Sequence, residues 1–439
     1  MLECDYLVIG SGATGMAFVD ELFHSTKDTT FIIVDKHHKP GGHWNDAYEF
    51  VTLHQPAQFY GVRSKILGKG NNDLASFNEI RAYYEDVMEE LTSSGRVRYF
   101  PQCEYQGNNV FRSLIQCGLE YTVHVRKKTV DGTYVGPSVP STRSPEYEVA
   151  NGAHVVPVNG IAMTKEAWER YVVVGGGKTG IDAVLYMLKN NVTPDRIFWI
   201  IPNDYWLFNR NFLFGENMWK MLDGFFTCVV ESTSYKELIQ KWDNCGLIMR
   251  IDTSIEPKRF KAGTVTTEEL EKLRLVKNVI RQGRVGRIEQ HRIVFQNGTE
   301  IPTTPKTLHI DCTGNGANPF TPKPIFDGSK ITLQNLRLFQ PCYSGCLIGA
   351  FEARYPEDEE RKNRVLTPIT HPHNLESYVK LFKQDILNDM GVEKELGLLW
   401  MRGNRLDMSY HISLFQYAGL VYFAYNSIPK MLLSLEHPV

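Results

Sequence analysis

Two glycine-rich turns in this chain have the spacing of dinucleotide-binding motifs. The first, Gly10-x-Gly12-x-x-Gly15, follows an apolar run typical of a buried strand and precedes a helical pattern. The first glycine of such a turn allows the sharp bend, the second lets the backbone approach a pyrophosphate, and the third lets helix and strand pack closely. The N–H groups that start the helix then face the phosphates. The residues expected at this site are Gly10, Ser11, Gly12, Ala13, Thr14 and Gly15.

An acidic residue stands at the position that such a motif requires. A second strand-like run, Phe31–Val34, ends at Asp35, which lies 20 residues after Gly15. A carboxylate at this place can accept hydrogen bonds from the hydroxyl groups of an adenosine ribose, and its charge would repel a 2′-phosphate. The first turn is therefore expected to bind an adenine dinucleotide without that phosphate.

The second glycine-rich turn, Gly175-Gly-Gly177-Lys178-Thr-Gly180, has similar surroundings. An apolar run of strand type at 171–174 precedes it, and a helical pattern follows. The chain is therefore expected to contain a second dinucleotide-binding unit. The residues expected at this second site are Gly175, Gly177, Lys178, Thr179, Gly180, Asn203 and Arg210.

The charges near the second turn differ from those near the first. The strand-like run 197–201 has no carboxylate at the position that matches Asp35, while Lys178 lies inside the turn and Arg210 follows a short aromatic run. Cations near the ribose suit a 2′-phosphate, which favours NADPH over NADH. Asp204 opposes this preference.

The elements around the turns predict an α/β fold with two Rossmann-like dinucleotide-binding domains, the second inserted into the first. Residues 77–94 have the spacing of an amphipathic helix, and 97–149 predict a small β subdomain. Residues 216–282 predict a solvated helical insertion. The apolar run 308–312 predicts a strand that rejoins the first sheet. The expected domains are 1–165 and 306–439 for the first unit and 166–305 for the inserted one.

Composition narrows the class of protein. The 439 residues are 42% apolar and 22% charged, with a net charge of −2, so we expect no nucleic-acid partner. Eight scattered cysteines form no C-x-x-C pair, and the first strand begins within the first six residues, which predicts a cytoplasmic protein with free thiols. No histidine or cysteine pattern predicts a metal site.

No apolar run reaches the roughly 18–20 residues that a membrane-spanning helix needs. The closest run is 412–425, which is rich in Phe and Tyr but contains Gln416. Such a segment lies on a membrane surface, at the interface of a homo-oligomer, or against the core of its own chain. The third interpretation is the plainest, and all three stay open.

Taken together, these motifs resemble the flavin-containing monooxygenase superfamily. The matching pieces are the two glycine turns, Gly41-Gly-His-Trp44, Asp311-Cys-Thr-Gly314 and Phe351-Glu-Ala-Arg-Tyr355. The resemblance implies FAD at the first turn, with Asp35 on its ribose, and NADPH at the second. It places segment 53–56 at the isoalloxazine ring. The further FAD contacts that it implies are Lys36, Gly42, His43, Trp44, His54, Gln55, Thr313, Gly314, Gln340 and Pro341.

By this resemblance the chain is an NADPH-dependent monooxygenase that inserts one atom of O₂ into a small organic substrate through a flavin C4a-peroxide. His54 and Gln55 are the catalytic candidates, because a histidine pKa near neutrality suits proton delivery. The family's Phe-x-Gly-x-x-x-His fingerprint is missing, since the stretch 150–160 has His154 without that spacing. Two alternatives stay open. One is an FAD-dependent dehydrogenase, reductase or oxidase without a stable peroxyflavin, and the other is a redox-silent nucleotide-binding protein.

Overall fold

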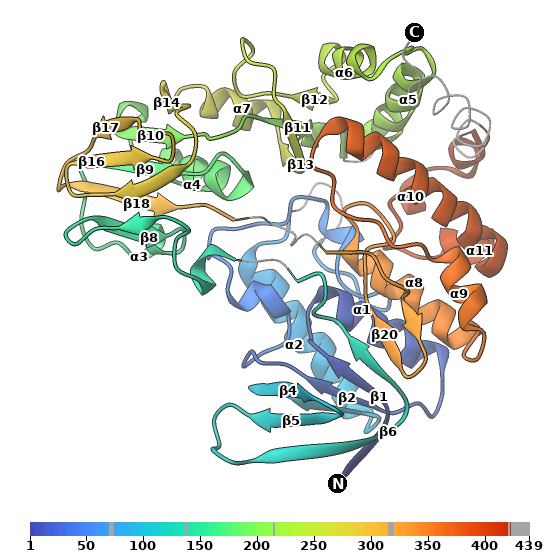
Figure 1. The fold of residues 1–439 in the computed structure, drawn as a ribbon. Coiled ribbons are helices and arrows are strands. Elements are labelled where there is room, and N and C mark those ends of the chain that lie inside the picture. Colours follow the sequence, from blue (N-terminus) through green and yellow to red (C-terminus); the bar gives the residue numbers. More distant parts are fainter. Residues whose placement is uncertain (70–73, 137–138, 214–215, 315–319, 420–421, 423–439) are drawn as a thin grey trace.

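A computed structural model describes residues 1–69, 74–136, 139–213, 216–314, 320–419 and 422 of the chain. Two sheets, one mainly parallel and one entirely parallel and each built around one glycine turn, lie in separate lobes (Figure 1). The first sheet has the order β19-β20-β6-β1-β2-β3, with a β4–β5 hairpin paired to β6. Its strands are β1 (Leu2–Ile9), β2 (Phe31–Val34), β3 (Val97–Phe100), β4 (Cys103–Gly107), β5 (Val110–Ser113), β6 (Glu120–Asp131), β19 (Phe326–Asp327) and β20 (Lys330–Thr332).

The expected β subdomain at 97–149 is only partly present. Strand β3 pairs with β2, and β6 pairs with β1 in parallel, so both belong to the first sheet itself. Only the β4–β5 hairpin projects from it. The error arose because short strands of alternating burial look alike whether they extend a large sheet or form a small one.

The second sheet has the order β14-β10-β9-β18-β8, and all its pairs are parallel. Here the expectation for residues 308–312 is wrong, because β18 pairs with β9 and β8 and not with the first sheet. The strands that return to the first sheet are β20 and β19. The inserted unit therefore extends beyond the expected boundary at 305. Its strands are β8 (His154–Pro157), β9 (Arg170–Val174), β10 (Ile197–Ile200), β14 (Asn278–Ile280) and β18 (Thr307–Asp311).

Two smaller sheets complete the insertion, which is thus less helical than expected. One has the order β12-β11-β13, and the other β17-β16-β15-β7 with a tight turn at Asn297-Gly298. Their strands are β7 (Glu148–Val149), β11 (Tyr205–Asn209), β12 (Ile248–Met249), β13 (Arg259–Val265), β15 (Val285–Ile288), β16 (Arg292–Phe295) and β17 (Glu300–Pro302). The helices packed with them are α5 (Glu216–Val230), α6 (Tyr235–Asn244) and α7 (Thr267–Leu273).

Helix α1 (Ala13–Ser25), which follows the first glycine turn, packs closely on α8 (Pro341–Arg354). A Cβ atom on Gly345 would collide with the carbonyl oxygen of Thr14, and one on Gly349 would lie 2.8 Å from that of Phe18. The two helices therefore meet backbone to backbone, which only glycine permits. This contact ties the C-terminal part of the chain to the first turn.

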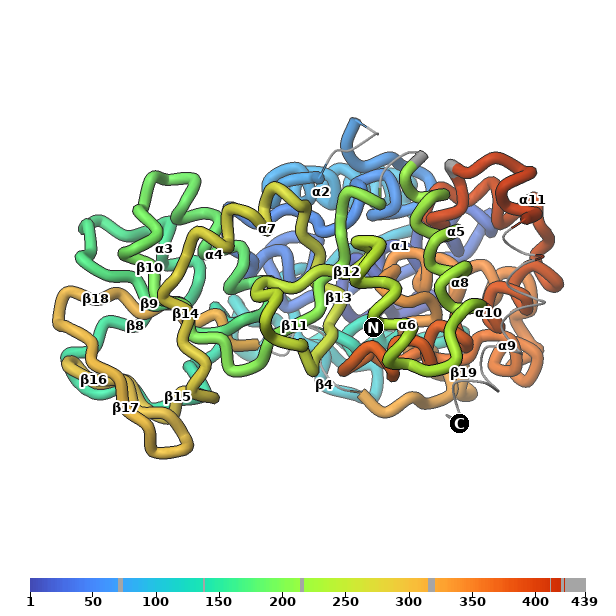
Figure 2. Tube along the Cα trace, turned by 90° about the horizontal axis from the view of Figure 1, so that it is seen from above, coloured from blue at the N-terminus to red at the C-terminus, as the bar shows by residue number. Residues whose placement is uncertain are grey.

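The remaining helices surround these layers, and the view from above separates the lobe of the second sheet from the rest (Figure 2). Helix α2 starts with the capping box Ser76–Glu79. None of the helices in the described ranges has the length and apolar character needed to cross a membrane. Segment 412–425 lies partly outside the described residues; within them Phe415 is exposed and Ile412 is buried. The helices are α2 (Phe77–Ser93), α3 (Gly160–Met163), α4 (Lys178–Lys189), α9 (Glu359–Val365), α10 (Leu375–Leu396) and α11 (Leu398–Arg402).

Candidate cofactor-binding sites

The first glycine turn leaves the start of α1 bare. Gly10 has φ 95°, and a Cβ on Gly15 would lie 2.5 Å from the carbonyl oxygen of Gly10. Gly12 is the N-cap residue, and no side chain of the described residues accepts a hydrogen bond from the first turn of α1. By contrast, α2, α6, α7 and α10 begin with side-chain caps. The uncapped N–H groups of α1 are therefore available to an anion.

A second glycine pair faces this turn. The Gly41 N–H donates to the Ser11 carbonyl oxygen at 2.9 Å, and a Cβ on Gly42, whose φ is 58°, would lie 2.8 Å from Cα of Gly12. The two backbones can approach this closely because neither glycine carries a side chain. The short helix Gly42–Asn45 follows, and its Trp44 donates from Nε1 to the Tyr60 hydroxyl at 2.7 Å.

The Asp35 carboxylate, at the end of β2, already has several hydrogen-bond donors. Its Oδ2 accepts from the N–H of Ser11 at 2.6 Å and from its hydroxyl at 2.7 Å. Its Oδ1 accepts from the N–H of His37 and lies 2.8 Å from the Nδ1 of that ring. The other ring nitrogen lies 2.8 Å from a carboxylate oxygen of Asp46. Any further hydrogen-bond donor to Oδ1 of Asp35 would therefore compete with the His37 ring.

These contacts shift two pKa values in opposite directions. The hydrogen bond to Asp35 raises the pKa of His37 against the effect of its burial, and Asp46 adds to this increase. Burial would raise the pKa of Asp35, but hydrogen bonds from His37 and Ser11 outweigh it and lower that pKa. The bridge is therefore strongest when His37 is protonated and both carboxylates are charged.

The other residues expected at the first site come from several parts of the fold. Lys36 is exposed, while burial lowers the pKa of His43 to about 4. Thr313 donates from its hydroxyl to Asp311 at 2.6 Å, and Gly314 follows it at the end of the second sheet. Gln340 is 1% exposed and donates to the Leu406 carbonyl oxygen at 3.2 Å, and its Oε1 has no partner among the described residues. Pro341 is the first residue of α8.

The second glycine turn resembles the first but is open. Gly175 has φ 129°, and a Cβ on Gly180 would collide with the carbonyl oxygen of Gly175. At Gly177, the N-cap residue of α4, no described atom lies within 4 Å of a Cβ position, and no described side chain caps the helix. The N–H groups at the start of α4 therefore have no side-chain acceptor among the described residues.

Two cations expected at the second site are engaged elsewhere. Lys178 forms an ion pair with Asp182, one turn further along α4. Arg210 is 3% exposed and pairs with Glu269 of α7 at 2.5 Å. Thr179 and Asn203 are partly exposed, beside the turn and after β10. Arg210 is thus a buried cation that already has an acidic partner.

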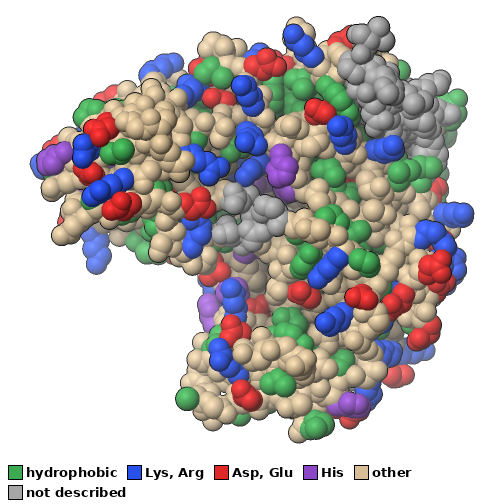
Figure 3. Space-filling view, viewed as in Figure 1, with side chains coloured by type: hydrophobic (Ala, Val, Ile, Leu, Met, Phe, Trp, Pro, Cys, Tyr) green, Lys and Arg blue, Asp and Glu red, His purple; other side chains and the backbone are tan. Residues whose placement is uncertain are grey.

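Other basic residues lie near the end of β10, and sequence reasoning missed them. Arg281 directly follows β14, the neighbour of β10, and holds Asp204 through two hydrogen bonds of 2.9 and 3.1 Å. Arg259 and Arg284 both lie close enough to Tyr205 and Lys261 to lower their pKa values, although burial raises that of Tyr205 overall. Figure 3 shows lysine, arginine and histidine side chains gathered at the hollow between the lobes. The alternation Arg259-Phe-Lys261 in a strand was the available signal.

The expected catalytic pair lies where the two lobes meet. The His54 carbonyl oxygen accepts a hydrogen bond from the Thr264 hydroxyl at 3.0 Å. Burial, reinforced by the charges of Lys178 and Arg210, lowers the pKa of His54 to about 3. Its imidazole is therefore neutral near pH 7 and can donate or accept a hydrogen bond. Gln55 is partly exposed beside it.

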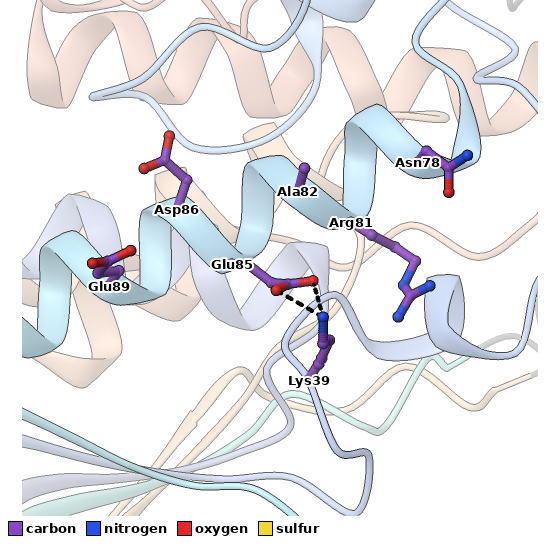
Figure 4. Close-up of a pocket in the computed structure, with 7 residues that line it drawn as sticks. All are labelled: Lys39, Asn78, Arg81, Ala82, Glu85, Asp86 and Glu89. Atoms are coloured by element: carbon purple, nitrogen blue, oxygen red, sulfur yellow. Dashed lines mark hydrogen bonds and ion pairs between the residues drawn. The ribbon is translucent and has the colours of Figure 1, made fainter.

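A hollow of about 350 Å³ lies elsewhere, on the solvent side of α2 (Figure 4). Lys39 reaches across it to Glu85 at 2.8 Å, and Arg81 points away from α2 on the side where Lys39 lies. The rest of its lining is Asn78, Ala82, Asp86 and Glu89, and none of the residues expected at either glycine turn contributes to it. In the described part of the chain, no group of three or more His, Cys, Asp or Glu residues is arranged to hold a metal ion.

This chain is similar in sequence to several known proteins and similar in fold to a solved structure. The uncharacterized protein Rv2000 of Mycobacterium tuberculosis is 40% identical over 403 residues, covering 88% of this chain and 74% of its own. The uncharacterized oxidoreductase CzcO of Bacillus subtilis is 26% identical over 43% of this chain and 53% of its own. Polycyclic ketone monooxygenase of Thermothelomyces thermophila superposes with a TM-score of 0.53 at 9% identity, covering 98% and 89%. No protein-family model matches the sequence.

Proposed function

This chain belongs to the family of the mycobacterial protein Rv2000 and has the fold of flavin-containing monooxygenases, and from this premise we propose that it is a flavin-dependent oxidoreductase. The observation that carries the proposal is the contact between Gly12 and Gly42. Two side-chain-free backbones facing each other at an uncapped helix start form a cradle that any larger residue would fill. The oxidoreductase name of CzcO agrees with this proposal.

The residues of the first site fit FAD. The N–H groups of α1 and the backbone of Gly42 would hold its pyrophosphate, and Asp35 would accept its ribose hydroxyls once His37 turns away. The unpaired buried Oε1 of Gln340 supplies a further acceptor at the start of α8. FAD is therefore proposed as the resident cofactor.

The residues of the second site fit a nicotinamide dinucleotide. Its pyrophosphate would lie on the open face of Gly177, against the uncapped start of α4. We propose NADPH, because Arg259 and Arg284 supply positive charge beside Tyr205, just beyond the end of β10. In this proposal Arg259 and Arg284, in place of Arg210, contact the 2′-phosphate.

We propose a monooxygenase reaction with O₂ on a small organic substrate, and a reductase or oxidase as the second candidate. The bound flavin would accept a hydride from the nicotinamide and transfer the electrons to O₂. The neutral His54 favours a hydrogen-bonding role over proton delivery as an imidazolium, because its pKa of about 3 leaves it uncharged. Gln55 would hydrogen-bond beside it. A cytoplasmic location remains a prediction.

Purification and oxygen balance test this proposal. The purified protein should be yellow and release FAD on denaturation, and NADPH should bleach its absorbance under anaerobic conditions. With ¹⁸O₂ and a panel of ketones, amines and thioethers, a monooxygenase incorporates label into product, whereas an oxidase converts all the oxygen consumed into hydrogen peroxide. Protein that binds no flavin after incubation with FAD contradicts the proposal as a whole.

A further inference from the structure

The segment that leads to the expected flavin edge is attached to the second lobe through α4. The Tyr48 hydroxyl donates to Oδ2 of Asp182 at 2.7 Å, and the ring of Phe50 stacks on that of Tyr186 with centroids 4.0 Å apart. Asp182 and Tyr186 are one turn apart and on the same face of α4. Two neighbouring aromatic residues of the first unit are thus bound to the helix that starts at the second glycine turn.

Further hydrogen bonds hold the same segment at both ends. The Asn159 amide donates to the carbonyl oxygen of Ala47 at 3.2 Å, and the Thr264 hydroxyl donates to that of His54 at 3.0 Å. Asn159 precedes α3, and Thr264 lies on β13, so both partners come from other parts of the chain. The position of segment 47–54 therefore depends on the position of the inserted unit, to which both of its ends are hydrogen-bonded.

The charge of Asp182 is balanced inside the same cluster. Lys178 and Asp182 are an i, i+4 pair on α4, with side chains 15% and 13% exposed. Burial would raise the pKa of Asp182, but the charge of Lys178 and the hydrogen bonds that Asp182 accepts from Lys178 and Tyr48 lower it. This carboxylate is therefore charged near neutral pH. Without Lys178, a negative charge would stand one turn from the N–H groups that face the open turn at Gly177.

We propose that Tyr48, Asp182 and Lys178 form an interdomain latch that positions the second glycine turn over the segment Leu53–Pro56. Asp182 holds Tyr48, and Lys178 neutralises Asp182 without contacting the dinucleotide phosphates. The three are positioning residues, since they act through the placement of the turn and the segment. This inference rests on the proposed use of a nicotinamide dinucleotide.

The role of Lys178 separates this inference from direct phosphate binding. In titration calorimetry of the flavin-loaded protein with NADP⁺, Lys178→Met should weaken binding by about tenfold, because Asp182 then repels the phosphates. The double variant Lys178→Met/Asp182→Asn should bind within about threefold of wild type, since the repulsion is gone. A double variant as weak as Lys178→Met would show that Lys178 holds phosphate directly and would overturn the latch.

The role of Tyr48 is tested by hydride transfer. Tyr48→Phe should slow anaerobic reduction of the flavin by NADPH by about tenfold, because a small misplacement of donor and acceptor is costly, while NADP⁺ affinity stays within about threefold. Tyr355→Phe is the matched control, since Tyr355 also donates to a carboxylate, Glu395, at 2.9 Å. Reduction of Tyr48→Phe at the wild-type rate would overturn the latch. Wild-type protein that binds no NADP⁺ would instead overturn the proposed function and this inference together.

Discussion

Replacing Gly177 by alanine separates cofactor binding from folding. The backbone of Gly177 has φ −80°, which every residue adopts, and no described atom lies within 4 Å of the added methyl group. The methyl group would occupy the open face where the dinucleotide pyrophosphate is proposed to lie. The folded protein should therefore tolerate a substitution that the complex does not.

The expected change in stability is small because two effects oppose each other. An alanine N-cap in place of glycine costs about 0.5–1 kcal/mol, since alanine is a poor N-cap. Reduced freedom of the unfolded chain returns about 0.4–1 kcal/mol. The free energy of unfolding should therefore stay within about 0.5 kcal/mol of wild type, whereas loss of close backbone contact should weaken NADP⁺ binding by about tenfold or more.

Urea unfolding and titration calorimetry with NADP⁺ measure the two quantities. Gly224→Ala is the matched control, because Gly224 lies within α5 and a Cβ there would meet, among the described residues, only Leu247, at 4.0 Å. The control should bind NADP⁺ like wild type. Unchanged affinity in Gly177→Ala would refute the reasoning, because it would mean that the dinucleotide does not approach this turn.

Three further substitutions test the rest of the site. Gly42→Ala should destabilise the protein by about 2 kcal/mol in urea unfolding and abolish FAD retention, because its φ is 58° and its Cβ would lie 2.8 Å from Cα of Gly12. His37→Asn should lower the melting temperature most near about pH 6. The raised pKa of His37 means that its stabilisation is complete below the unfolded pKa and is lost as pH rises through the folded one, so the difference should shrink by about pH 9. An equal difference at both pH values would contradict the bridge. Arg259→Ala should raise the KM for NADPH by about tenfold and leave that for NADH unchanged, whereas equal effects on both would exclude a 2′-phosphate contact.

The glycine turns could be predicted because their requirements are local. Gly15 and Gly180 each lie against the first glycine of their own turn, and the surrounding strands and helix are contiguous in sequence. Asp35 was found by the same rule, since it ends the next strand. The sequence does not show that the ring of His37, two residues later, is hydrogen-bonded to the Asp35 carboxylate.

The wrong prediction for β18 and the pairing of Arg210 concern contacts between residues that are far apart in the sequence. All five residues of β18 are buried, and a fully buried parallel strand looks the same in either sheet, so its sequence does not say which neighbour it pairs with. Arg210 had a plausible position in the sequence, but the fold buries it against Glu269. The cations near Tyr205 come instead from β13 and from the turn after β14, which are separated from β10 by more than one helix.

The two turns differ in a way that fits their proposed cofactors. The loop at Gly41 and Gly42 is hydrogen-bonded to the first turn and packs on it at Gly12, so the first turn has a second backbone segment beside it. The second turn has no comparable segment at Gly177 among the described residues, so a ligand there can leave without breaking a backbone contact. A site with two backbone segments suits a cofactor that stays bound through many turnovers, and an open one suits a hydride donor that must be replaced after each. The proposed latch at Tyr48 acts on this open site, where few enclosing contacts fix the orientation of a ligand, so that its orientation rather than its affinity depends on the placement of the turn.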